Sequence, residues 1–294
     1  MFYRRKIILA LIQIFEGELE KIRLQKLLFL FTQKQNEKIF DFIPYKYGCF
    51  SYTANADLTA MAGKEMLTET ESHFTSNEKT DYIKSLKEID LKHLKEIKQL
   101  YGNMSANALM KHTYTNFPYW ATNSIKAESL LTAEEFEKVK NSKVVGNKTI
   151  LFTIGYEGVS LEEYLNRLLR NDVKILVDVR NNPLSMKYGF NKNQLKRYCE
   201  NLGIVYMHFP EVGIQSEQRQ ELNTQIDYDK LFDIYRANNL TKTVSTQTKI
   251  LRLLEEHQRI ALTCFEANIC QCHRKHLAEA IENLPNFKYE VKHI

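Results

Sequence analysis

Residues 149–180 read TILFTIGYEGVSLEEYLNRLLRNDVKILVDVR. Two short apolar runs rich in β-branched residues, at 149–154 and 174–179, flank a segment that opens with Ser160-Leu-Glu-Glu163. A serine followed three residues later by glutamate is a capping box, which predicts a helix that runs to about residue 170. Strand, helix and strand in this order form a β-α-β unit, whose crossover makes the two strands parallel.

Downstream of this unit, apolar runs and amphipathic segments alternate to the end of the chain. We expect helices near residues 194–201, 228–237, 245–256 and 273–283, and strands near 204–208, 259–265 and 289–291. Strands that alternate with helices are typical of α/β domains. Residues 148–294 are therefore predicted to form a Rossmann-like three-layer α/β domain with a mostly parallel sheet.

The N-terminal half has a different pattern. Large apolar residues recur at helical spacing in three segments, residues 7–15, 24–31 and 81–101. Thr132 opens a second capping box, and the segment 141–148 is short, polar and mixed. We therefore predict a mainly α-helical domain over residues 1–147, ahead of the α/β domain.

The composition is that of a soluble globular protein, with 44% apolar and 26% charged residues and no apolar run long enough to span a membrane. Five cysteines, three of them bunched at 264–272, argue against a disulfide framework and favour reduced thiols in the cytoplasm. Cys49 and Cys199 are predicted to be core thiols. The net charge is +5, of which +4 falls on residues 1–148, so the chain permits an anionic partner such as nucleic acid.

Three loops follow predicted strands, where open parallel sheets bind their ligands. The first is Gly155-Tyr156-Glu157-Gly158. Its glycines let the backbone approach a ligand, and the N-terminus of the next helix favours an anion. We predict that Gly155, Tyr156 and Gly158 bind substrate and that Glu157 is catalytic. The alternative is a plain turn that needs glycines for its geometry.

The second loop carries an acid and a guanidinium off the second strand, in the sequence Asp178-Val-Arg180-Asn181. Arg180 is predicted to hold a phosphate or carboxylate bidentately, with Asn181 as a further substrate contact. Asp178 is predicted to be catalytic. The alternative is an Asp–Arg pair that fixes the loop.

The third loop runs from Cys264, at the end of a strand, to Cys272-His273-Arg274 at the start of a helix. A thiol at a helix N-terminus beside a histidine and an arginine is expected to have a lowered pKa, which suits a nucleophile. Glu266 is predicted to be a base or to orient His273, the acid–base partner. Arg274 is predicted to be a second anion-binding residue.

A metal site is the competing interpretation of this loop. Zinc or iron ligands are available from Cys264, Cys270, Cys272, His273 and His276. The spacing lacks the C-x₂-C arm of a standard zinc site, and no second ligand pair is evident elsewhere. The sequence therefore predicts no cofactor, with zinc or iron kept as the minority alternative.

The C-terminal half, from about residue 149, resembles the family catalogued as domain of unknown function 488. Four ordered motifs carry the resemblance, at residues 153–158, 178–183, 210–213 and 264–274. Ile269 and Ile214 depart from the proline and glycine of the family pattern. The resemblance implies a Rossmann-like domain but no reaction. The motif order is also weakly similar to rhodanese-like domains, although the loop from Cys264 to Arg274 is too long for a rhodanese loop.

The N-terminal half resembles a Panacea-type, antitoxin-like domain over about residues 5–125. The resemblance rests on Leu-Gln-Lys-Leu-Leu-Phe at 24–29 and Tyr-Lys-Tyr-Gly-Cys-Phe at 45–50. It implies a helical module that recognises a protein partner or nucleic acid.

Three function classes remain open at this stage. We favour an enzyme that acts on nucleic acid or a nucleotide by hydrolysis or transfer, by analogy in defence against phage or foreign DNA. A non-catalytic ligand sensor with a partner-binding helical domain is the first alternative. A sulfur-transfer or redox protein that works through Cys272 or Cys264 is the second.

Overall fold

The computed structural model describes residues 1–215, 218 and 222–294. It divides into two compact units, Met1–Lys143 and Val144–Ile294. The division lies in the short polar segment 141–148, where the sequence places the boundary at residue 147. Each unit is described by itself.

The N-terminal unit is mainly helical around a core formed by α1 and α2. Its longer elements are α1 (Tyr3–Ile14), α2 (Lys21–Gln33), α3 (Tyr52–Ala62), α4 (Glu88–Tyr101), α5 (Ala106–Asn116) and α7 (Ala133–Asn141), with the single turn α6 (Ala127–Leu130) between the last two. Thr132 and Glu135 form the predicted capping box at the start of α7. Phe117 and Trp120 pack against the core, and Tyr114 is 1% exposed, so the aromatic residues that precede α6 are structural.

Short strands in this unit were not predicted. A three-stranded antiparallel sheet has the order β1-β5-β4, from β1 (Glu18–Glu20), β4 (Leu67–Glu69) and β5 (His73–Ser76), and β2 (Ile43–Tyr45) pairs with β3 (Gly48–Phe50). Segments of three or four residues are too short to show a period of two. The expected helical segment 81–101 is also divided, because the turn Ile83–Ser85 precedes α4.

The C-terminal unit confirms the predicted α/β fold. Its elements are β6 (Ile150–Gly155), α8 (Leu161–Arg170), β7 (Ile175–Asp178), α9 (Lys192–Glu200), β8 (Val205–His208), α10 (Gln225–Tyr235), α11 (Val244–His257), β9 (Arg259–Cys264), α12 (His273–Glu282) and β10 (Glu290–His293). The sheet has the order β10-β6-β9-β7-β8, and every neighbouring pair is parallel. Ser160 caps α8 through the amide of Glu163.

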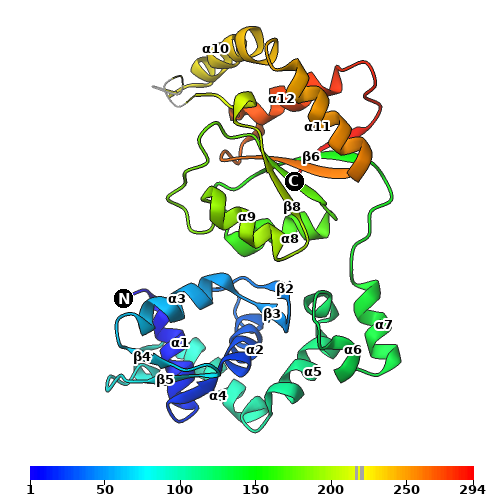
Figure 1. Cartoon of the computed structure of the whole chain (residues 1–294). Helices are drawn as coiled ribbons and strands as arrows, with labels where there is room; N and C mark the ends of the chain where they lie inside the picture. The colour runs from blue at the N-terminus through cyan, green and yellow to red at the C-terminus, as the bar shows by residue number, and fades with distance from the viewer. Residues whose placement is uncertain (216–217, 219–221) are drawn as a thin grey trace. The chain divides into compact units, whose positions relative to one another are not determined.

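The helices cover both faces of this sheet. Figure 1 shows α8 and α9 on one face and α10, α11 and α12 on the other. The connections that leave β6 and β7 therefore run to one face, whereas the connection that leaves β9, the strand between them, runs to the opposite face. Such a switch of direction opens a crevice at the carboxyl ends of the strands. The end of β9 is therefore the expected place for a ligand.

Both isolated cysteines lie in the hydrophobic core, as predicted: Cys49 and Cys199 are fully buried. Among the residues that the structure describes, no helix is long and apolar enough to cross a membrane.

Candidate active site at the end of strand β9

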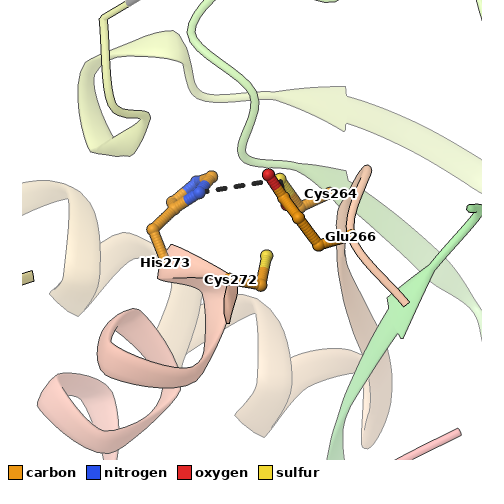
Figure 2. A group of neighbouring side chains, drawn as sticks. All are labelled: Cys264, Glu266, Cys272 and His273. Atoms are coloured by element: carbon orange, nitrogen blue, oxygen red, sulfur yellow. Dashed lines mark hydrogen bonds between the residues drawn. The ribbon is translucent and has the colours of Figure 1, made fainter. Parts of the chain in front are cut away.

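Four ionisable side chains converge where β9 ends and α12 begins. One ligand-type atom from each of Cys264, Glu266, Cys272 and His273 lies within 4.8 Å of the corresponding atom in every other member. Figure 2 shows the four side chains pointing toward a common centre. Cys264, Cys272 and His273 are at most 1% exposed, whereas Glu266 is half-buried. We call this set the β9 cluster.

Hydrogen bonds fix which nitrogen of His273 faces the cluster. Its Nε2 lies 3.0 Å from the carbonyl oxygen of Val179, which can only accept, so Nε2 carries the proton. In the neutral ring, Nδ1 is then the acceptor nitrogen, and it lies 3.6 Å from Cys264 Sγ. The same sulfur donates to Glu266 Oε2 at 3.1 Å. The imidazole therefore presents an acceptor, and not a donor, to the Cys264 thiol.

The loop after β9 is held against the first loop by its backbone. The carbonyl of Phe265 accepts from the amides of Tyr156 and Glu157, at 3.1 and 2.9 Å. A Cβ on Gly155 would lie 2.0 Å from the carbonyl oxygen of Glu266, so only glycine fits there. The absence of a side chain at Gly155 therefore lets the two loops pack closely. This role agrees better with the alternative in which glycine is needed for the geometry of the turn than with the prediction that Gly155 binds substrate.

Glu157 and Arg274 hold the same loop through their side chains. Glu157 Oε2 accepts from the amide of Ala267 at 2.9 Å. Arg274 Nη1 donates to the carbonyl of Glu266 at 2.5 Å, and its Nη2 donates to that of Ala267 at 3.3 Å. Arg274 is 2% exposed. The side chains of Glu157, predicted to be catalytic, and Arg274, predicted to bind an anion, thus both bond to the protein's own backbone.

The expected lowering of the Cys272 pKa is wrong. Cys272 does stand at the N-cap position of α12, as the sequence suggests, although its side chain forms no cap hydrogen bond. Its side chain is fully buried, however, and burial raises the pKa of the Cys272 thiol well above its usual value, with further increases from Cys264 and Glu266. Arg274 opposes the rise only in part. The desolvation penalty on a thiolate outweighs the helix terminus and the neighbouring cation.

Asp178 and Arg180 form a buried pair beside the cluster. Asp178 Oδ1 accepts from the backbone amide and the Nε of Arg180, at 3.1 and 2.8 Å. Asp178 Oδ2 accepts from Arg180 Nη2 and from Tyr206 Oη, both at 2.5 Å. Arg180 Nη1 donates to Tyr156 Oη and to the carbonyl of Phe190, at 2.8 and 2.9 Å.

This network leaves Arg180 little capacity for a ligand. The hydrogen bonds occupy four of the five N–H donors of its guanidinium, and all sites on the Asp178 carboxylate are used. Burial lowers the pKa of Arg180, but the hydrogen bond and charge interaction with Asp178, helped by Tyr156, outweigh burial and raise this pKa above its usual value. Burial next to Asp178 raises the pKa of Tyr206. The alternative of an Asp–Arg pair that fixes the loop describes the structure better than a phosphate clamp.

Two cavities border the β9 cluster. One of about 300 Å³ is lined by Cys264 and Phe265 together with residues of the first two loops, among them Tyr156, Asn181 and Asn182. The other, of about 250 Å³, is lined by Glu266, Gln271 and residues of α10. Asn181 donates to the carbonyl of Pro210, which positions its amide at the wall of the first cavity. Gly158 has a φ of +74° and no atom near its Cβ position, so it serves the turn.

Cys270 and His276 do not belong to the cluster. Cys270 is exposed, and the Nδ1 of His276 contacts Arg236 and Glu279 instead. Of the ligands in the minority metal interpretation, the structure brings together Cys264, Cys272 and His273, and it adds Glu266.

Several residues of the site were not predicted from the sequence. Tyr206 and His208 come from β8, which pairs with β7 so that Asp178 lies opposite His208, and the Nε2 of His208 donates to the carbonyl of Arg180. Phe190 stacks on Tyr156 at 4.3 Å between ring centroids. Tyr206 and His208 could have been predicted from their position near the end of β8, because the carboxyl ends of parallel strands meet at one edge of the sheet. No local signal marks Phe190.

Replacing Asp178 with asparagine tests the structural role of the pair. Breaking a buried pair costs about 3–5 kcal/mol, because it leaves Arg180 charged and buried without its carboxylate. We expect the calorimetric transition of the C-terminal unit to shift to lower temperature. Trp120, the only tryptophan, lies in the N-terminal unit, so its fluorescence transition should stay in place.

The matched control is Asp233→Asn, which removes the partner of Arg236 from an exposed pair. Exposed pairs contribute about 0–1 kcal/mol, so this variant should unfold like the wild type. Equal stability of the two variants would show that Asp178 does not hold the loop.

Comparison with known proteins bears on this unit. The family model described as "Domain of unknown function DUF488" matches residues 160–281. No curated protein matches the chain. The family match does not extend to the N-terminal unit, whose expected resemblance stays a prediction. Residues 160–281, which include β7, β9 and the whole β9 cluster, are thus similar to the DUF488 family, as the motifs of the C-terminal half predict.

Proposed function

We propose that the C-terminal unit is an enzyme that hydrolyses a bond in a nucleotide or nucleic-acid substrate. The observation that carries the proposal is the β9 cluster itself. Four ionisable side chains, three of them buried, meet at the switch point of a parallel sheet and border two cavities. Burying such groups together costs stability, which folds accept mainly at functional sites.

The first cavity has the chemistry to hold a nucleobase. The ring of Phe265, which lines it, is 42% exposed and offers a face on which a flat base can stack. The amides of Asn181 and Asn182 lie in the same wall, and side-chain amides hydrogen-bond to base edges. Arg180 and Arg274 position the loops around this cavity rather than clamp a phosphate.

Glu266 is the best-placed general base. It is the half-buried member of the cluster, and it lines the second cavity, so water can reach its carboxylate. In the proposed step, a water oxygen attacks the electrophilic atom of the substrate while Glu266 takes the proton. The same proton then passes to the leaving group, which restores the carboxylate. Defence against foreign DNA is a context in which such an enzyme would serve, by analogy only.

A Glu266→Gln substitution tests this role. The amide is nearly isosteric but does not accept the proton, so we expect kcat to fall by about a hundredfold or more. A panel of nucleotides and short DNA and RNA strands, analysed by chromatography of the products, would first establish the substrate. Glu256→Gln, on the exposed end of α11, is the matched control and should retain full activity.

An unchanged kcat in Glu266→Gln would remove Glu266 from the chemistry. Binding of a nucleotide without turnover by the wild type would favour the sensor function. Loss of activity on thiol alkylation with Glu266 dispensable would favour sulfur chemistry at Cys264, whose sulfur lies near His273 Nδ1.

We also propose that the N-terminal unit recognises a partner through a cavity beside α2. The cavity has a volume of about 510 Å³, and its lining combines apolar and aromatic residues with polar and charged ones, among them Lys26, Lys46 and Glu71. Lys26 is 2% exposed, and its Nζ donates to the carbonyl of Cys49 at 2.8 Å. Within the described ranges, no carboxylate forms an ion pair with it. Burial lowers the pKa of Lys26, so a carboxylate from a ligand would restore the stability of its charged form.

This environment fits an acidic peptide with aromatic side chains better than a nucleic acid. The full chain should bind a labelled peptide of this kind, and Lys26→Met should weaken binding about tenfold, since a hydrogen bond to a charged group contributes about 1.5–3 kcal/mol. Lys64→Met, at an exposed position of the same unit, is the control. Preference for an oligonucleotide, with affinity that falls steeply with salt, would favour nucleic acid as the partner instead.

A further inference from the structure

We propose that the β9 cluster binds one zinc ion through Cys264, Cys272, His273 and Glu266. This inference goes beyond the proposed hydrolysis, because it concerns what the cluster holds and not the reaction. Two thiols, an imidazole and a carboxylate are the side chains that zinc prefers, and four such donors match its usual tetrahedral coordination. Their ligand atoms already lie within 4.8 Å of one another, and Figure 2 shows them arranged around one centre.

The orientation of His273 is that of a metal ligand. In metal sites, the ring nitrogen that does not bind the ion donates to a carbonyl or carboxylate, which fixes the tautomer. His273 Nε2 donates to the carbonyl of Val179 in this way, so Nδ1 has its electron pair directed at the cluster. The carbonyl belongs to the residue just after β7, so the sheet itself sets the ring.

The exposure of the four side chains assigns them different roles at the ion. Cys264, Cys272 and His273 are buried and come from the rigid end of β9 and the start of α12, so they form a fixed set of three ligands. Glu266 is half-buried, comes from the loop and borders a cavity. It therefore takes the fourth position as the exchangeable ligand. A water or substrate atom that replaces it would leave the Glu266 carboxylate off the ion, where it could act as the proposed base.

Arg274 offsets the charge of the filled site. Two thiolates and one carboxylate carry three negative charges against the two positive charges of the ion. The Arg274 guanidinium lies beside them, donates to the carbonyl of Glu266 and is 2% exposed. On binding, the two thiols lose their protons to solvent as the zinc–sulfur bonds form. No electron is transferred in this step, so no oxidant or reductant is needed.

The test begins with the full chain, purified without chelator or affinity metal. Elemental analysis should find about one zinc per chain. After removal of the zinc by a chelator, added Co²⁺ should restore stoichiometric binding. It should give the intense visible absorption of a tetrahedral cobalt site and a thiolate-to-cobalt charge-transfer band in the near ultraviolet. The calorimetric transition of the C-terminal unit should fall on chelation, with the Trp120 transition unchanged.

Single substitutions assign the ligands. Cys264→Ser and Cys272→Ser should each weaken zinc binding by a hundredfold or more and remove part of the charge-transfer band, whereas Cys270→Ser, at an exposed cysteine outside the cluster, should match the wild type. Where a variant fails to fold, the cobalt spectrum of the wild type still decides the proposal. Absence of transition metal as purified, together with no charge-transfer band on adding Co²⁺, overturns it. Iron in place of zinc overturns the choice of ion.

The outcomes separate this inference from the proposed reaction. Stoichiometric zinc without hydrolysis of any nucleotide or nucleic acid would support the metal site and contradict the proposed function. Hydrolysis by protein that neither contains nor binds metal would support the proposed function and contradict the metal site.

Discussion

The geometry of the site depends on the close approach of the Glu266 carbonyl to Gly155. A side chain at residue 155 would occupy the space of that carbonyl, so the absence of a Cβ brings the two loops together. The amides of Tyr156 and Glu157 then reach the carbonyl of Phe265, and the Arg274 guanidinium reaches that of Glu266. Because its backbone is fixed on both sides, the Glu266 carboxylate would lose little conformational freedom in the proposed reaction, which is how preorganised sites lower a barrier.

The same site draws on three adjacent strands of the sheet. β6 supplies the glycine, β9 supplies Cys264, and the residue after β7 supplies the carbonyl that orients His273. Because β9 lies between the other two and its connection leaves on the opposite face, the loops do not compete for the same space. The Asp178–Arg180 pair stiffens the β7 side of this arrangement, since its hydrogen bonds reach both the first loop and the segment before α9. A buried ion pair of this kind is weak evidence of stability, but it specifies one arrangement of the loops.

The sequence was sufficient for the α/β unit because its signals are long and agree with one another. The capping residue Ser160, the apolar runs on either side and the strand-end position of Cys264 all point to one topology. The sequence could not predict how deeply the side chains of the site are buried. Cys272 is at a helix N-terminus beside a cation, which lowers a thiol pKa in water, but the surrounding core reverses the sign. Arg180 likewise has the residue type of an anion clamp, and only the structure shows that Tyr156, Asp178 and a backbone carbonyl use its donors.

The sequence argues against a metal site on spacing, but the backbone of Cys272 allows the proposed zinc site despite that spacing. Neighbouring residues inside a helix point about 100° apart, so an adjacent Cys-His pair would not share one ion. Cys272, however, is the N-cap, with φ −127° and ψ 131°, and only His273 has begun the helix. The change from extended to helical backbone between them turns both side chains toward the end of β9. There, the side chains of Cys264 and Glu266 both point into the cluster, whereas the side chain of Phe265 between them lines the neighbouring cavity. Spacing rules derived from zinc knuckles describe two ligands on one turn, whereas the proposed site would take one pair from the end of a strand and its loop and the other pair from the start of a helix. A search for C-x-E followed by C-H across a strand–loop–helix junction would therefore find this arrangement in other chains.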